Sequence, residues 1–166
     1  MLFGRDALGL AKLLSLLVPA GLLAGAYGSQ HLGGLAPCEM CYWQRYAHLA
    51  GLAFALAATA LGGRLPDRGR SLVWLAALGI AASGAIGFYH AGVEAGYFEG
   101  FTQCTSQIRG GSTEDVLNQI LMAPVIRCDQ IQWSLLGISM AGWNAILSLG
   151  SALVILWLSL KRSPIR

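Results

Sequence analysis

The sequence predicts an all-α membrane protein, a bundle of four transmembrane helices. Of its 166 residues, 55% are hydrophobic and only 11% are charged, whereas soluble domains carry about a quarter charged residues. The apolar residues form four runs bounded by charges, each near the roughly 20 residues that a helix needs to cross a bilayer. Other backbone structures leave unpaired polar groups in lipid. We therefore expect one integral membrane domain over 1–166, with helices at 11–31, 42–62, 71–91 and 137–160.

The basic residues predict the orientation of these helices. Eight lie at the termini or in the connection 63–70, and three lie in or beside the other two connections. Because positive charge concentrates on the cytoplasmic side, both termini and 63–70 are expected there, and 32–41 and 92–132 on the outer side. The net charge of +3 is then a signal of topology, and it gives no reason to expect a nucleic-acid partner.

Within the helices, small residues predict close packing. The first helix contains Pro19, which is expected to bend it. In the third helix, Gly79, Ser83 and Gly87 recur at four-residue spacing, and such a row lets a neighbouring helix approach closely.

The long outer connection is expected to hold a short helix in the stretch "GGSTEDVLNQILMAP". Ser112 or Thr113 provides a cap, acidic residues fill the first turn, and Pro124 follows the end. The apolar residues Val116, Leu117, Ile120 and Leu121 share one face. That face suits a horizontal helix on the bilayer surface, with packing against the other loop as the alternative.

All four cysteines fall on the predicted outer side, where disulfides persist. Cys38 and Cys41 form a Cys-x-x-Cys pair in the first connection, and Cys104 and Cys128 lie in the second. A zinc site needs four ligands, but the second pair is separated by 23 residues. Two structural disulfides are a second interpretation, although the four-residue ring of Cys38–Cys41 would constrain little chain. Thiol–disulfide exchange is the third, and it gives both pairs a use.

Exchange needs a thiolate, and the sequence places Cys41 where one is stabilised. Cys41 lies at the start of the helix 42–62, and Arg45 follows one turn later on the same face. Arg45 alone would also suit a side chain that extends to the lipid headgroups. His90, at the outer end of the third helix, is either solvated or a hydrogen-bond donor to a bound acceptor. His48 is expected to be buried and hydrogen-bonded.

Taken together, these motifs resemble the bacterial disulfide-bond formation protein B (DsbB) family. The matching features are "CEMCYWQR" at 38–45, "FYHAGVEAG" at 88–96, Cys104, and "RCDQIQWSLLGISMAGWN" at 127–144. The resemblance implies an enzyme of the bacterial inner membrane with its active site on the periplasmic side. Such an enzyme reoxidises a soluble periplasmic DsbA-type thiol oxidase and passes the electrons to membrane quinone, either ubiquinone or menaquinone.

The resemblance also implies roles for individual residues. Cys104 forms the mixed disulfide with the partner, and Cys128 releases the oxidised partner. Cys38–Cys41 then reoxidises that pair, with Cys38 as the link to Cys104. Cys41 contacts the quinone, with Arg45 and His90 beside it, and no metal is expected. A membrane metal-binding or transport protein is the main alternative, and a static scaffold is a third.

Overall fold

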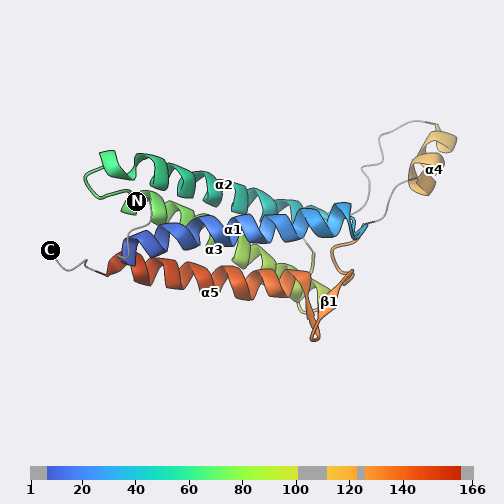
Figure 1. The fold of residues 1–166 in the computed structure, drawn as a ribbon. Helices are drawn as coiled ribbons and strands as arrows, with labels where there is room; N and C mark the ends of the chain where they lie inside the picture. The colour runs from blue at the N-terminus through green and yellow to red at the C-terminus, as the bar shows by residue number, and fades with distance from the viewer. Residues whose placement is uncertain (1–6, 101–111, 123–125, 162–166) are drawn as a thin grey trace.

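The computed structural model describes residues 7–100, 112–122 and 126–161. Four long helices form one bundle: α1 (Ala7–His31), α2 (Glu39–Leu61), α3 (Arg70–Glu94) and α5 (Met140–Leu160). Each is long and apolar enough to cross a membrane, which confirms the predicted fold class. In Figure 1 the first turn of α1 and the last turn of α5 lie at the same end of the bundle, as four successive crossings require.

The row of small residues on α3 packs against two neighbours. A Cβ atom on Gly79 would lie 2.9 Å from the backbone of Gly51 in α2, and one on Gly87 would lie 3.0 Å from the carbonyl oxygen of Ala141 in α5. Ser83, between the two glycines, is fully buried. The backbones of α2 and α5 therefore approach α3 closely, as the four-residue spacing predicted.

The α2–α3 connection is short and is fixed by one acidic side chain. A 3₁₀ turn, η1 (Gly62–Arg64), follows α2. Asp67 then accepts hydrogen bonds from the backbone N–H groups of Gly69, at 2.9 Å, and Ser71, at 2.7 Å. Gly69 is the N-cap of α3 and Ser71 lies in its first turn, where backbone N–H groups have no intrahelical partner. Asp67 therefore satisfies donors at the start of α3.

The fourth long helix begins three residues later than predicted. Strands β1 (Ser134–Leu135) and β2 (Ile138–Ser139) form an antiparallel hairpin. Its two turn residues, Leu136 and Gly137, have φ values of 54° and 76°, the left-handed conformation of a tight hairpin turn. A helix cannot include these residues, so α5 starts at Met140. Ser139 caps it by accepting a hydrogen bond from the N–H of Gly142 at 3.1 Å.

A short helix, α4 (Thr113–Met122), lies in the long connection, as predicted. Ser112 is the capping residue: its hydroxyl accepts from the N–H of Asp115 at 3.2 Å, and its own N–H donates to the Asp115 carboxylate at 3.1 Å. Figure 1 shows α4 beyond the end of the bundle where α2 begins. Pro124 and the side chains of Val116, Ile120 and Leu121 lie outside the described residues. Contact of α4 with the bilayer surface therefore stays a prediction.

Candidate functional site

The Cys-x-x-Cys pair occupies the beginning of α2. The helix starts at Glu39, three residues earlier than predicted, so Cys38 is its N-cap and Cys41 lies in its first turn. The two sulfur atoms are 3.1 Å apart. Hydrogen bonding to Cys41 and burial raise the pKa of the Cys38 thiol above its ordinary value. Cys38 therefore keeps its proton, while the helix N-terminus and its unpaired N–H groups stabilise negative charge on Cys41.

Cys128, which is distant from this pair in the sequence, lies close to Cys38 in the structure. Cys38 Sγ, Cys128 Sγ and a ring nitrogen of His90 all lie within 4.8 Å of one another, and all three residues are buried. Cys104 lies outside the described residues, so its predicted link to Cys38 stays a prediction. The cysteine that the structure places beside Cys38 is Cys128, a neighbour that the spacing of the sequence did not indicate.

The protonation of His90 can be assigned from its hydrogen bonds. The side-chain amide of Gln44 donates to the Met40 carbonyl oxygen at 3.2 Å and to His90 Nδ1 at 3.0 Å. Because Nδ1 accepts, the proton of the neutral ring lies on Nε2. That atom faces the Cys128 carbonyl oxygen at 3.1 Å and Cys38 Sγ at 3.6 Å. His90 is thus buried, and its Nε2–H is a hydrogen-bond donor toward the Cys128 carbonyl oxygen and the Cys38 sulfur.

Arg45 is turned into the bundle and does not extend toward the lipid headgroups. It is 6% exposed. Its guanidinium donates to Gln30 Oε1 at 2.5 Å and to the Ala26 carbonyl oxygen at 3.0 Å, both in α1, and lies 4.8 Å from the centre of the Tyr27 ring. Its Nε atom has no partner, and no carboxylate of the described residues forms an ion pair with it. A buried cation without an anion favours binding of negative charge.

A chain of polar side chains leads from His90 into the bundle. Gln44 accepts a hydrogen bond from Asn144 Nδ2 at 2.8 Å, and Asn144 Oδ1 lies 2.9 Å from His48 Nε2. His48 is therefore buried and hydrogen-bonded, as predicted. Neither Gln44 nor Asn144 was among the site residues predicted from the sequence. A signal existed for Asn144, because it is the only side-chain amide in the apolar stretch 140–160 and polar residues inside membrane spans are usually functional.

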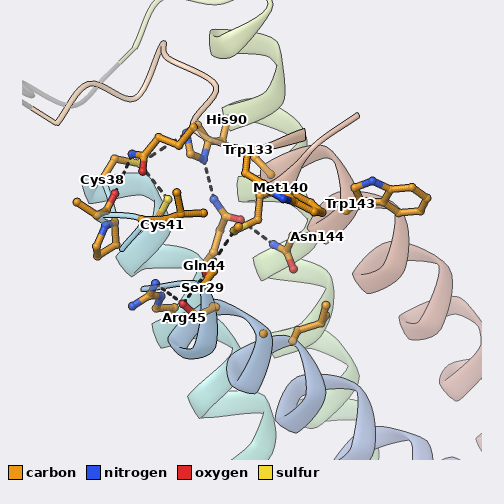
Figure 2. Close-up of a pocket in the computed structure, with 18 of the residues that line it drawn as sticks. Ser29, Cys38, Cys41, Gln44, Arg45, His90, Trp133, Met140, Trp143 and Asn144 are labelled. Carbon is orange, nitrogen blue, oxygen red and sulfur yellow. Dashed lines mark hydrogen bonds between the residues drawn. The ribbon is translucent and has the colours of Figure 1, made fainter. Parts of the chain in front are cut away.

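These side chains line a pocket of about 590 Å³ between α1, α2, α3 and α5. Figure 2 shows Cys38, Cys41 and Arg45 along α2, with His90 from α3 and Asn144 from α5 on the other side of Gln44. The volume is typical of sites for small organic molecules. The remaining walls are largely apolar, from residues including Gly21, Leu22, Leu23, Gly25, Ala26, Leu35, Met140 and Trp143. The residues therefore fit an apolar ring with polar atoms at its edge, which is the shape of a quinone head group.

The fold and the site together define a multi-pass membrane protein with a Cys-x-x-Cys pair beside a pocket inside the bundle. Comparison with known proteins makes the class specific. Residues 9–158 match the family described as disulfide bond formation protein DsbB. The chain belongs to this family and is a membrane protein of disulfide-bond formation.

Named relatives cover nearly the whole chain. The disulfide bond formation protein B of Aromatoleum aromaticum is 30% identical over 87% of this chain and 89% of its own. Disulfide bond formation protein B 2 of Pseudomonas aeruginosa is 32% identical over 81% and 80% of the two chains, and the Paracidovorax citrulli protein is 30% identical over 92% and 88%. No solved structure matches the chain.

Proposed function

We propose that this chain is an inner-membrane thiol:quinone oxidoreductase that reoxidises a periplasmic DsbA-type thiol oxidase. The observation that carries the proposal is the Cys38–Cys41 pair at the start of α2, on the wall of a pocket that also holds the buried cation of Arg45. The distribution of basic residues supports a periplasmic location for this end of the bundle. The termini and the α2–α3 connection are then cytoplasmic.

The chemistry of the dithiol balances with that of a quinone. When Cys38 and Cys41 form a disulfide, one S–S bond forms and two electrons and two protons leave the thiols. A bound quinone supplies the acceptor for both electrons and both protons. Cys41 is the sulfur that carries negative charge, so its proton has already passed to solvent, from which the quinone takes up its second proton; Cys38 holds the other proton, and the Nε2–H of His90 lies beside it. Arg45 supplies positive charge that is already fixed in place by α1, so little reorganisation is needed as charge develops.

The position of Cys128 suggests how electrons reach this pair. The partner first reduces Cys104–Cys128 through a mixed disulfide on Cys104. The Cys128 thiolate then attacks Cys38, so the Cys38–Cys41 bond breaks, Cys41 leaves as a thiolate and Cys38–Cys128 forms. Cys104 next attacks Cys128, which restores Cys104–Cys128 and leaves Cys38 reduced. This order gives Cys128 the link to Cys38 that the resemblance had suggested for Cys104.

The direct experiment mixes the purified protein anaerobically with a reduced DsbA-type oxidase and ubiquinone. Stoichiometric ubiquinol should form, and the variants Cys41→Ser and Cys104→Ser should abolish it. The variant Cys128→Ser lacks the Cys104–Cys128 disulfide that the reduced partner attacks, so it should form no mixed disulfide on Cys104 and should not turn over. Absence of electron transfer in the wild-type protein, together with stoichiometric binding of zinc, would refute the redox function.

One observation favours a second candidate, a soft-metal site. Cys38, His90 and Cys128 lie close enough together to bind one ion. A metal at His90 Nε2 needs a lone pair on that atom, whereas the hydrogen bond from Gln44 to Nδ1 leaves the proton on Nε2. The geometry therefore supports the redox function better. Titration of the reduced protein with Co²⁺ separates the two, since a cysteine-bound cobalt gives an intense thiolate charge-transfer band.

A further inference from the structure

The pocket contains a buried histidine that the proposed chemistry does not use. His48 lies in α2, is 3% exposed and lines the pocket. Its Nδ1 atom is buried and has no hydrogen-bond partner among the described residues. Buried polar atoms are nearly always hydrogen-bonded, and leaving one unpaired is costly. The atom therefore indicates a partner beyond the described residues, and the pocket that His48 lines offers room for a bound molecule.

The hydrogen bonds of Asn144 determine which kind of partner is missing. Asn144 Nδ2 donates to Gln44 Oε1 at 2.8 Å and to the Ser83 carbonyl oxygen at 3.2 Å, so Asn144 Oδ1 faces His48 Nε2 at 2.9 Å. This oxygen only accepts hydrogen bonds, so Nε2 carries the proton of the neutral His48 ring. Nδ1 is then an acceptor, and the missing partner is a donor.

The spacing along α2 indicates where this donor lies. His48 follows Cys41 by seven residues, which places the two side chains on nearly the same face, about 10 Å apart along the helix axis. That length suits a six-membered ring with one oxygen near Cys41 and Arg45, a second oxygen at the opposite ring edge, and a hydrogen bond of about 2.8 Å beyond it.

We propose that His48 Nδ1 accepts a hydrogen bond from the hydroxyl group that the reduced quinone carries at the ring edge remote from Cys41. The inference rests on the proposed quinone function and adds that the pocket prefers the reduced ring over the oxidised ring. An oxidised quinone offers only acceptor oxygens, so it leaves Nδ1 unpaired, whereas a quinol satisfies it. His48 thus favours the reduced ring. The two electrons of that ring still come from Cys38 and Cys41, one proton comes from the Cys38 thiol and the other from solvent, and His48 keeps its own proton throughout.

Two substitutions distinguish ligand binding from a structural role of His48. In His48→Gln the side-chain amide nitrogen replaces Nε2, so the hydrogen bond to Asn144 Oδ1 is kept. No hydrogen-bond acceptor then remains at the position of Nδ1. In His48→Asn the amide oxygen reaches the place of Nδ1, and the bond to Asn144 is lost. Ser148→Ala is the matched control, since the Ser148 hydroxyl donates to Asn144 Oδ1 at 2.9 Å and does not line the pocket.

The readout is anaerobic equilibrium binding of decylubiquinol and decylubiquinone to the full-length chain in detergent. A Cys41→Ser background prevents electron transfer during the measurement. His48→Gln should weaken quinol binding about threefold to tenfold, the effect of one neutral hydrogen bond, with quinone binding nearly unchanged. His48→Asn should retain most of the quinol affinity, and Ser148→Ala should retain all of it.

The wild-type protein provides a second measurement that does not depend on folding of a variant. The ¹⁵N chemical shift of His48 Nδ1 should move when decylubiquinol is added and stay constant with decylubiquinone. An unchanged shift with quinol, as expected if a water molecule occupies the place of the donor, would overturn the inference. Normal quinol affinity in His48→Gln, or an equal loss for both forms, would also overturn it. If the wild-type protein neither binds nor reduces quinone, the proposed function itself fails.

Discussion

Replacing Arg45 by methionine should reduce quinone-dependent turnover strongly while changing the stability of the bundle little. Removing one preorganised donor that faces developing charge costs about 10²–10³ in kcat, or about 2.7–4 kcal/mol. The stability terms oppose each other. Two hydrogen bonds from the guanidinium to α1 are lost, at about 1.5–3 kcal/mol each. A buried cation without an ion-pair partner is also removed, which recovers several kcal/mol of desolvation penalty. The free energy of unfolding should therefore change by less than about 2 kcal/mol.

The assay measures ubiquinone reduction by the purified protein and, in parallel, formation of the mixed disulfide with the reduced partner protein. Arg45→Met should slow quinone reduction and leave mixed-disulfide formation largely intact. Arg45→Lys should restore part of the rate, because it keeps the charge and loses the planar fork. Arg64→Met, at the opposite end of α2, is the control. Equal losses in both half-reactions, with a lowered melting temperature, would show that Arg45 is structural.

Three further predictions concern the dithiol, the α2–α3 connection and the helix packing. Alkylation of the reduced protein at pH 8, read by mass spectrometry, should label Cys41 faster than Cys38, because Cys38 is buried and its pKa is raised; faster labelling of Cys38 would contradict the assignment of the proton. Hydrogen bonds from Ser71 and Gly69 lower the pKa of Asp67 to about 2, so its stabilising effect is complete above about pH 4 and is lost as the pH falls toward 2. Asp67→Asn should therefore lower the melting temperature at pH 7 and flatten its decline between pH 4 and 2; an unchanged acid profile would argue against the cap. Gly79→Val should destabilise the bundle by about 1–3 kcal/mol in a denaturant titration, since its Cβ would lie 2.9 Å from Gly51, while Gly21→Val, with open space around it, should have a much smaller effect.

The helical fold could be predicted because the length and composition of each apolar run are enough to indicate a membrane-spanning helix. A segment of about 20 apolar residues has few alternatives to a membrane-spanning helix, and the glycine row of α3 indicated a packing face. The start of α5 could not be predicted in the same way. Leu136 adopts a positive φ that its side chain disfavours, and the hairpin that requires it depends on pairing between Ser134 and Ser139.

The candidate site was only partly predictable for a similar reason. The position of Cys41 relative to Arg45 follows from helical spacing, so both residues were found from the sequence. The proximity of Cys38 to Cys128 depends on the return of the chain across 90 residues, and no local pattern encodes it. The same holds for Asn144, whose partners Gln44 and His48 come from a different helix.

The dependence of α2 on α5 has a consequence for biosynthesis. The ribosome makes α2 long before α5, and Gln44 Oε1 and His48 Nε2 receive their side-chain partner only when Asn144 enters the bundle. The Gly51–Gly79 contact needs only α2 and α3, so those two helices can pair as a hairpin during insertion. The polar side chains of α2 therefore lack their hydrogen-bond partner in α5 until that last helix is inserted. A truncated or stalled chain would carry the Cys-x-x-Cys pair without the finished pocket, so quality control of this protein should depend on completion of its C-terminal helix.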